Sequence, residues 1–267
     1  MSHVIEIRDS GDEHKLKKRQ KRALFTPIAP TIAVIILTVF AFMAGAANNG
    51  PKGLLEMKSV TFSIDYVRLW GARYFPHDFD NGWRWLTCTL VHVSFTHMIT
   101  NFIFMMILGI TFESMAGSLR TLVVFVASAL GGGFIAIVTE SPCVVYIGAS
   151  GINFGFAGAL VAYSLRNAIL KKPFQSWISW WGVVAGEMFM IIGMFLEPII
   201  LSKNDVSNMT HFGGFMSGLV VCALMLSPQG NMGWKSIQVA SGLMLVAIFA
   251  IAPAIAYTSV LEDARVC

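Results

Sequence analysis

Long apolar runs recur along this chain, and shorter polar or aromatic stretches separate them. Because a helix needs about 20 mainly apolar residues to cross the hydrocarbon core of a bilayer, each such run predicts a transmembrane helix. The sixth run is short, and the seventh contains Pro253, which neighbouring helices can accommodate. We predict seven spans: Ala23–Ala47, Val93–Phe112, Leu119–Val138, Gly151–Ile169, Trp177–Leu201, His211–Leu226 and Ile237–Tyr257.

The segments outside these spans complete the expected domain organisation. Residues 1–22 are polar and basic and predict a disordered head, and the run that follows is too long for the core of a signal peptide. Residues 48–91 are the one long connection and are rich in tryptophan and tyrosine, which favour the membrane interface. We therefore expect one membrane domain over residues 23–257 with an interfacial loop at 48–91, and a short extracytoplasmic tail at 258–267.

Composition and charge agree with this organisation. The chain is 55% hydrophobic and 13% charged, with a mean hydropathy of +0.67, which excludes an ordinary soluble domain and indicates an all-α polytopic membrane protein. The basic cluster from Lys15 to Arg22 predicts a cytoplasmic N-terminus, and seven crossings then place the C-terminus outside. We interpret the net charge of +4 as a topology signal and a contact with anionic lipids, not as a nucleic-acid surface.

A serine and a histidine stand at the ends of two glycine-rich apolar runs. Ser150 lies in Gly-Ala-Ser-Gly at the outer end of the fourth predicted helix, and His211 begins the sixth. Small residues on one face let membrane helices approach closely, so packing these faces together would bring the Ser150 hydroxyl within hydrogen-bonding reach of His211. The predicted packing glycines are Gly151, Gly155 and Gly158 on the fourth helix and Gly214 and Gly218 on the sixth.

Packing alone is the competing interpretation, because glycine and serine are common in membrane helices. The motif also differs from the nucleophile elbow of soluble hydrolases, since Ile152 stands where that elbow requires glycine. The second predicted helix favours chemistry, because His97 and Asn101 share one face and, in the predicted orientation, lie at the depth of the serine and the histidine. These two donors would stabilise an oxyanion together with the Ser150 backbone N–H; the alternative is a structural interhelical hydrogen bond.

Five motifs connect these residues to a known family. They are Trp83-Arg84, His92 with His97-x-x-x-Asn101, Glu113-x-x-x-Gly117, Gly148-Ala149-Ser150-Gly151 and His211-x-x-Gly214-x-x-x-Gly218. In this order, and over the stretch from Gly50 to Leu226, they resemble the rhomboid intramembrane serine proteases. The resemblance implies a Ser150–His211 dyad without a third acidic member, and an oxyanion site that includes His97 and Asn101.

The resemblance extends to the helix count and to one substitution. It implies a rhomboid-like six-helix core, with Ile237–Tyr257 as the seventh, C-terminal helix of the six-plus-one form of secretase-type rhomboids. Many members carry tyrosine one turn after the serine, where it stacks on the histidine. Here Phe154 stands at that position, which retains the stacking and removes any phenolic hydrogen bond.

We therefore predict an intramembrane serine endopeptidase that cleaves single-span membrane proteins within or beside their transmembrane segments. Its partners would be transmembrane protein substrates and the lipid bilayer, with no cofactor, metal or nucleic acid. The active site would face the extracytoplasmic side of a plasma or secretory-pathway membrane. The first alternative is a catalytically silent rhomboid-like binder, which the intact Ser150 and His211 disfavour; the second is a transporter or channel, which would need ionisable residues across the membrane.

Two features stay open between alternatives at this level. Glu187 lies within the fifth predicted span and is either a functional carboxylate or a protonated, hydrogen-bonded structural residue. Cys88 and Cys143 both fall on the predicted outer side and form either a disulfide or two buried free thiols.

Overall fold

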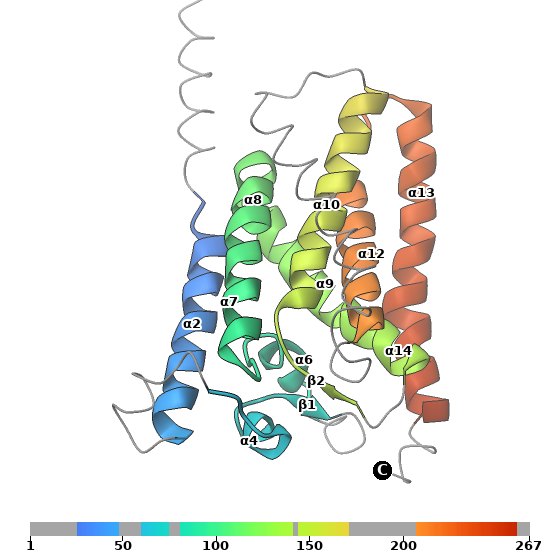
Figure 1. The fold of residues 1–267 in the computed structure, drawn as a ribbon. Helices are drawn as coiled ribbons and strands as arrows, with labels where there is room; N and C mark the ends of the chain where they lie inside the picture. Colours follow the sequence, from blue (N-terminus) through green and yellow to red (C-terminus); the bar gives the residue numbers. More distant parts are fainter. Residues whose placement is uncertain (1–25, 48–59, 75–80, 141–143, 171–206, 261–267) are drawn as a thin grey trace, which may run out of the picture.

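The computed structural model describes residues 26–47, 60–74, 81–140, 144–170 and 207–260 (Figure 1). Within these ranges the chain is a bundle of helices with a single pair of two-residue strands, so the predicted all-α polytopic membrane fold is confirmed. The predicted head, the fifth span Trp177–Leu201 with its Glu187, and Cys143 lie outside the described residues.

Each of the six predicted spans that fall within the described ranges corresponds to a helix. The second and the last of them are built from consecutive α-helical and π-helical segments. The segments are α2 (Ile28–Ala47); α7 (Phe95–Phe104), η2 (Met105–Gly109) and α8 (Ile110–Ala116); α9 (Ser118–Thr139); α10 (Ser150–Ile169); α12 (Asn208–Met225); and α13 (Met232–Val246), η3 (Ala247–Ile251), α14 (Ala252–Ile255) and η4 (Ala256–Val260).

The predicted starts of α2, α12 and α13 are wrong by several residues. The side chains of Ser207 and Asn231 accept a backbone N–H from the first turns of α12 and α13, and so extend both helices into polar sequence. Helix α2 instead starts late, at Ile28, directly after Pro27, because proline disfavours helical geometry in the residue before it. Apolar periodicity locates a helix, but the capping side chains decide where it begins.

Helix α10 differs from the other predicted spans in its composition. Five described helices are long and apolar enough to cross a membrane, and α10 is not among them although it has 20 residues. Glycine, asparagine and arginine lower its hydropathy, yet most of its residues are buried between α9 and α12. A helix that is enclosed by protein makes little contact with lipid, so it need not be uniformly apolar.

Two short helices and the strand pair lie at one end of the bundle, which is the end where α7, α10 and α12 begin (Figure 1). They are α4 (Ile64–Leu69), α6 (Arg84–Thr87), β1 (Arg73–Tyr74) and β2 (Val145–Tyr146), and the strands pair antiparallel. The Arg84 guanidinium joins this region by donating to the backbone oxygens of Arg68 and Ala72, each at 2.7 Å. The described part of the loop predicted at 48–91 is thus a folded layer at the end of the bundle, and its place in the membrane interface stays a prediction.

At the opposite end of the bundle, Glu113 ties three helices together. Its carboxylate accepts the backbone N–H of Ile28 at 3.1 Å and of Ala29 at 3.0 Å, and the Ser118 hydroxyl at 2.6 Å. The side chain is 1% exposed, so these bonds replace the water that a buried carboxylate would otherwise need. The negative charge also lies at the N-terminus of α2, where the helix dipole favours it.

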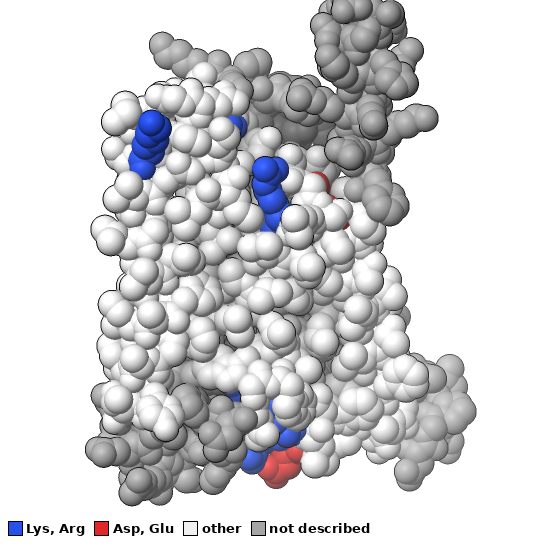
Figure 2. Space-filling model, turned by 180° about the vertical axis from the view of Figure 1, so that it is seen from behind, with Lys and Arg blue, Asp and Glu red and all other residues white. Residues whose placement is uncertain are grey.

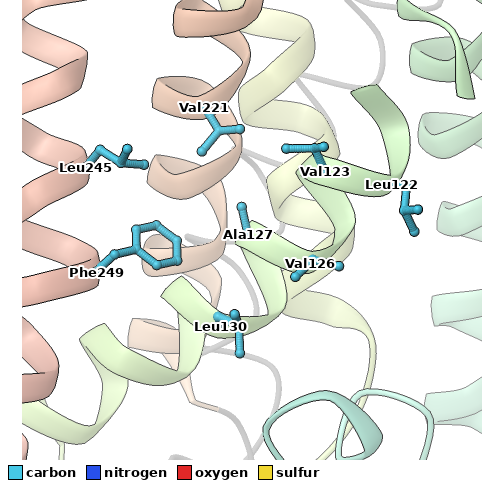
Figure 3. Close-up of a pocket in the computed structure, with 8 residues that line it drawn as sticks. All are labelled: Leu122, Val123, Val126, Ala127, Leu130, Val221, Leu245 and Phe249. Atoms are coloured by element: carbon cyan, nitrogen blue, oxygen red, sulfur yellow. The ribbon is translucent and has the colours of Figure 1, made fainter. Parts of the chain in front are cut away.

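A groove opens between α9, α12 and the last helical run, and Figure 3 shows the side chains around it. Its volume is about 530 Å³, and every residue that lines it is aliphatic or aromatic. Since it holds no nucleophile, no titratable group and no polar side chain, it is not a candidate active site. The lining residues are Leu122, Val123, Val126, Ala127 and Leu130 of α9, Val221 of α12, Leu245 of α13 and Phe249 of η3.

Candidate active site

Ser150 and His211 meet between α10 and α12. Ser150 is the first residue of α10 and His211 lies in the first turn of α12. The Ser150 Oγ and the His211 Nε2 are 2.7 Å apart, which is a short hydrogen bond between residues 61 positions apart in the sequence. A serine hydroxyl bonded to an imidazole nitrogen is the arrangement that activates a nucleophile.

Glycine sets the distance between the two helices that carry this pair. A methyl group on Gly214 would overlap the carbonyl of Gly151, and one on Gly218 would overlap the carbonyl of Gly155. The backbones of α10 and α12 are therefore in direct contact, as small residues allow in membrane helices. All four glycines lie in this contact, which holds the two side chains of the pair within bonding distance of each other.

The turn that leads into α10 also requires glycine. Gly148 has a φ of +97°, a conformation that residues with a side chain rarely adopt. A Cβ at this position would lie 2.6 Å from Cε1 and 2.7 Å from Nε2 of His97. The backbone N–H of Gly148 donates to the Cys88 oxygen at 2.8 Å, so the turn is tied to the end of α6.

His92 supports the same turn through a defined tautomer. Its Nδ1 lies 3.3 Å from the Leu90 carbonyl oxygen, which can only accept, so Nδ1 carries the hydrogen. Its Nε2 is then free to accept the backbone N–H of Ala149 at 3.3 Å. Burial, and secondarily the neighbouring His97, hold the pKa of His92 well below its ordinary value, so the ring stays neutral and keeps this acceptor. The sequence motif contained His92 without indicating this role.

Phe154 stacks on the histidine of the pair. The two ring centroids are 4.4 Å apart, and the ring planes differ by 23°. Phe154 lies one turn after Ser150 on α10 and is 5% exposed, while His211 is 3% exposed. The imidazole is therefore confined between the aromatic ring and the serine, in a setting from which most water is excluded.

Glu140 positions the first turn of α12. Its carboxylate accepts the Ser207 hydroxyl at 2.6 Å and the backbone N–H of Met209 at 3.0 Å. Ser207 in turn accepts the backbone N–H of Thr210 at 3.0 Å, directly before His211. The sequence carried no signal for this role, because Glu140 follows α9 and its partners lie almost 70 positions later.

His97 and Asn101 lie beside the start of α10, on the face of α7 that the sequence predicted. The His97 ring packs on Gly148 and meets the His92 ring edge to face, with centroids 4.9 Å apart. Asn101 is 4% exposed and donates from Nδ2 to the His97 carbonyl oxygen at 3.0 Å. It also accepts a bond from Asn153 of α10, a residue that the sequence analysis did not single out. The sequence feature that could have identified Asn153 is its polar side chain within an apolar run, three residues after Ser150.

The described part of the site contains no cluster of metal ligands and no reactive thiol. No group of three or more His, Cys, Asp or Glu residues in the described ranges could hold a metal ion. Cys88 is a free, buried thiol in the described part of the chain, and burial raises its pKa, which disfavours the thiolate. Cys143, the other cysteine of the disulfide alternative, lies outside the described residues. The absence of a metal from the chemistry stays a prediction.

Comparisons with known proteins agree on one family. A sequence model of the family described as Rhomboid domain matches residues 80–228, which is more than half of the chain. The chain is similar to RHOMBOID-like protein 5 of Arabidopsis thaliana, with 31% identity over 55% of this chain and 45% of that protein. It is 28% identical to the putative rhomboid protease YdcA of Bacillus subtilis, over 53% of this chain and 66% of that protein. It is also 28% identical to the rhomboid protease GluP of Bacillus subtilis, over 62% of this chain and 30% of that protein.

Proposed function

This chain belongs to the rhomboid family, and on that basis we propose that it is an intramembrane serine endopeptidase that uses Ser150 as nucleophile and His211 as general base. The observation that carries the proposal is the 2.7 Å contact between Ser150 Oγ and His211 Nε2 inside the matched domain. The matches span about half or less of several relatives' own length, so the activity is proposed for this chain from its own geometry.

The reaction follows from the protonation states that this contact requires. His211 Nε2 accepts the Ser150 proton while Nδ1 keeps the ring hydrogen, and Ser150 Oγ forms a bond to the scissile carbonyl carbon. The tetrahedral intermediate collapses when His211 returns the proton to the departing amine, which leaves an acyl-enzyme on Ser150. Water, deprotonated by His211, then attacks the ester and releases the second product with the serine restored.

Three donors are proposed to stabilise the negative oxygen of the tetrahedral intermediate. The Ser150 backbone N–H lies at the N-terminus of α10, where the helix dipole favours negative charge. His97 and Asn101 project from α7 beside the turn that precedes Ser150. Donors that are already in place in a site with little water stabilise a developing charge more than donors in bulk water do.

The proposed substrates are single-span membrane proteins, cut near the outer membrane face. The dyad lies toward the end of the bundle where α4, α6 and the strands gather, so a scissile bond there is near an interface (Figure 1). A substrate helix must unwind before the serine can reach a carbonyl, and unwinding deep in lipid leaves backbone groups without partners. Gly-to-Leu changes in the outer third of a substrate helix should therefore slow cleavage more than equal changes in the inner third.

The proposed topology places the N-terminus in the cytoplasm and the active site on the other side. Helix α2 begins at one end of the bundle and η4 ends at the other, as an odd number of crossings requires (Figure 1). The basic head residues from Lys15 to Arg22 favour the cytoplasm for the first of these ends. Reporter fusions at Met1 and Cys267 test this proposal, which fails if both reporters lie on one side of the membrane.

The decisive test uses the full chain reconstituted in liposomes with a tagged single-span substrate. The wild type should cleave the substrate and react covalently with a fluorophosphonate probe, whereas Ser150→Ala should do neither. Ser128→Ala is the matched control, because Ser128 is a buried helical serine whose Oγ has no hydrogen-bond partner in the described part of the chain. Activity should survive exhaustive chelation. A wild type that binds the substrate but neither cleaves it nor reacts with the probe would support the silent binder instead.

A further inference from the structure

Two buried amide side chains connect α7 to α10 next to the proposed oxyanion donors. The Asn153 Nδ2 lies 3.0 Å from Asn101 Oδ1 and 3.1 Å from the Asn101 backbone oxygen. Asn153 is 1% exposed and Asn101 is 4% exposed. Asn153 is three residues after Ser150, so it lies in the first turn of the helix that the nucleophile begins.

The backbone partners determine which way both amides point. A backbone carbonyl oxygen can only accept, so the Asn153 atom that faces the Asn101 carbonyl must be its nitrogen. That nitrogen also faces the Asn101 side chain, which must therefore present its oxygen. The same orientation of Asn101 directs its own Nδ2 to the His97 carbonyl oxygen at 3.0 Å, again an acceptor. Both contacts of the Asn101 amide require one and the same orientation.

The Asn101 nitrogen retains a second hydrogen beyond the one it donates to His97. An amide nitrogen carries two hydrogens, and the Asn153 contact uses only the oxygen of the Asn101 amide. If the amide were reversed, its oxygen would face the His97 carbonyl and its nitrogen would face the Asn153 nitrogen, which are two repulsive contacts. Asn153 thus opposes the orientation in which Asn101 would present an oxygen, rather than a donor, to an oxyanion.

The energetic cost of burying the Asn153 amide indicates that the nitrogen of this amide has a function. The Asn153 Oδ1 is buried and has no hydrogen-bond partner among the described residues. A buried polar atom without a partner destabilises the folded protein, and an apolar side chain of similar size would avoid that cost. The cost is explained if the nitrogen of the same amide performs a task that an apolar residue cannot perform.

We propose that Asn153 is a positioning residue for the oxyanion site: its amide orients the Asn101 carboxamide so that one Nδ2 hydrogen is available to the scissile carbonyl oxygen. The inference rests on the proposed function. Because Asn153 and Ser150 share one helical turn, the bond also fixes the donor on α7 relative to the nucleophile on α10. Asn153 itself is not assigned a contact with the substrate.

A double-mutant cycle tests the proposal in the full chain in liposomes. The variants are Asn153→Leu, Asn101→Ala and the double variant, with kcat, KM and the thermal midpoint measured for each. We expect Asn153→Leu to lower kcat by a factor between about 10 and 100 with KM little changed, since misplaced catalytic groups typically cost up to about 100-fold. In the Asn101→Ala background the same substitution should have no further effect on kcat, because its target is gone.

Two further variants separate positioning from a structural role. Asn167→Leu is the matched control, because Asn167 is a buried asparagine near the other end of α10; this variant should keep the wild-type kcat. If Asn153→Leu does not fold, Asn153→Ala removes the same amide without requiring extra room. A kcat that stays at the wild-type value, or that falls equally in both backgrounds along with the thermal midpoint, overturns the positioning role and leaves the protease intact. A wild type that neither cleaves nor reacts with the fluorophosphonate overturns the proposed function and this inference with it.

Discussion

Two parts of the surface of α12 are packed differently. On one side Gly214 and Gly218 touch the backbone of α10, and the serine–histidine pair lies at the end of that contact. Toward α9 and the last helical run, Gly213 also lies close to the backbone of Gly131, but farther along α12 Val221 faces a groove of about 530 Å³ that apolar side chains of α9, α13 and η3 surround (Figure 3). Backbone contact leaves no room for a methyl group, whereas branched side chains keep the helix axes apart and leave unfilled space.

The distribution of polar groups follows the same division. The contact between α10 and α12 ends beside a cluster of hydrogen-bonded side chains that includes His92, Asn101 and Asn153. The residues that line the groove include no polar side chain, and the space-filling view of the back of the molecule shows a broad uncharged middle, with Lys, Arg, Asp and Glu only toward the two ends (Figure 2). The close contact between α10 and α12 thus lies beside the proposed catalytic residues, whereas the loosely packed groove is lined only by apolar side chains.

The largest difference between the two sides should come from removing the base. His211→Ala should lower cleavage by a factor on the order of 10⁶, the typical cost of losing one member of a serine–histidine catalytic pair. Val123→Ala in the groove is the control and should keep the activity near the wild-type value, because Val123 is 40% exposed and lines a groove that contains no residue of the proposed site. Cleavage of a reconstituted substrate measures both. Appreciable activity in His211→Ala would exclude this residue as the base.

The next largest effect should come from the oxyanion donors. His97→Ala and Asn101→Ala should each lower turnover by about 10²–10³ with little change in KM, as the removal of one oxyanion donor does in serine proteases. The two losses need not add, because both donors can serve one oxygen. Steady-state kinetics of the single and double variants provide the measurement. Unchanged turnover in the double variant would show that these side chains only pack α7.

A single methyl group should distinguish the glycine contact from an open helix face. Gly214→Ala would overlap the Gly151 carbonyl and push α10 away from α12, so we expect cleavage to fall by about 100-fold and the thermal midpoint to drop. Gly242→Ala on α13 is the matched control, because no atom of the described residues, apart from the backbone of its own helix, lies within 4 Å of the added Cβ. It should retain activity and gain up to about 1 kcal/mol of stability from the better helix former. Equal behaviour of the two variants would refute the close packing.

The smallest effect should come from adding bulk to the groove. Ala127→Leu places a larger apolar side chain into space that is already present between α9 and η3, so cleavage and the thermal midpoint should stay near wild type. Gly155→Ala is the variant for comparison, because the methyl group that it adds to α10 would overlap the Ser128 side chain of α9. Thermal unfolding and cleavage assays measure both variants. A loss in Ala127→Leu as large as that in Gly155→Ala would mean that the groove is packed as tightly as the glycine contact.

Much of this architecture could be predicted from residue patterns. Apolar runs located each span that lies within the described residues, because lipid requires long apolar helices, and glycine spacing identified the faces of α10 and α12 that meet. The patterns did not predict where two of the helices start, or that α10 would be less apolar than the other spans. Capping by Ser207 and Asn231 moved two helix starts, and α10 is less apolar than a lipid-facing span because its neighbours enclose it.

What the sequence determined by itself is the set of membrane helices, the glycine faces and the serine and histidine at their ends, because periodicity and composition are properties of one segment at a time. Only the tertiary structure decided that Asn153 bonds to Asn101, that His92 bonds to the turn before Ser150, and that Glu140 bonds to the start of α12. These partners are between 52 and 69 positions apart in the sequence. A hydrogen bond depends on distance and direction in space, and no spacing within a single helix contains that information.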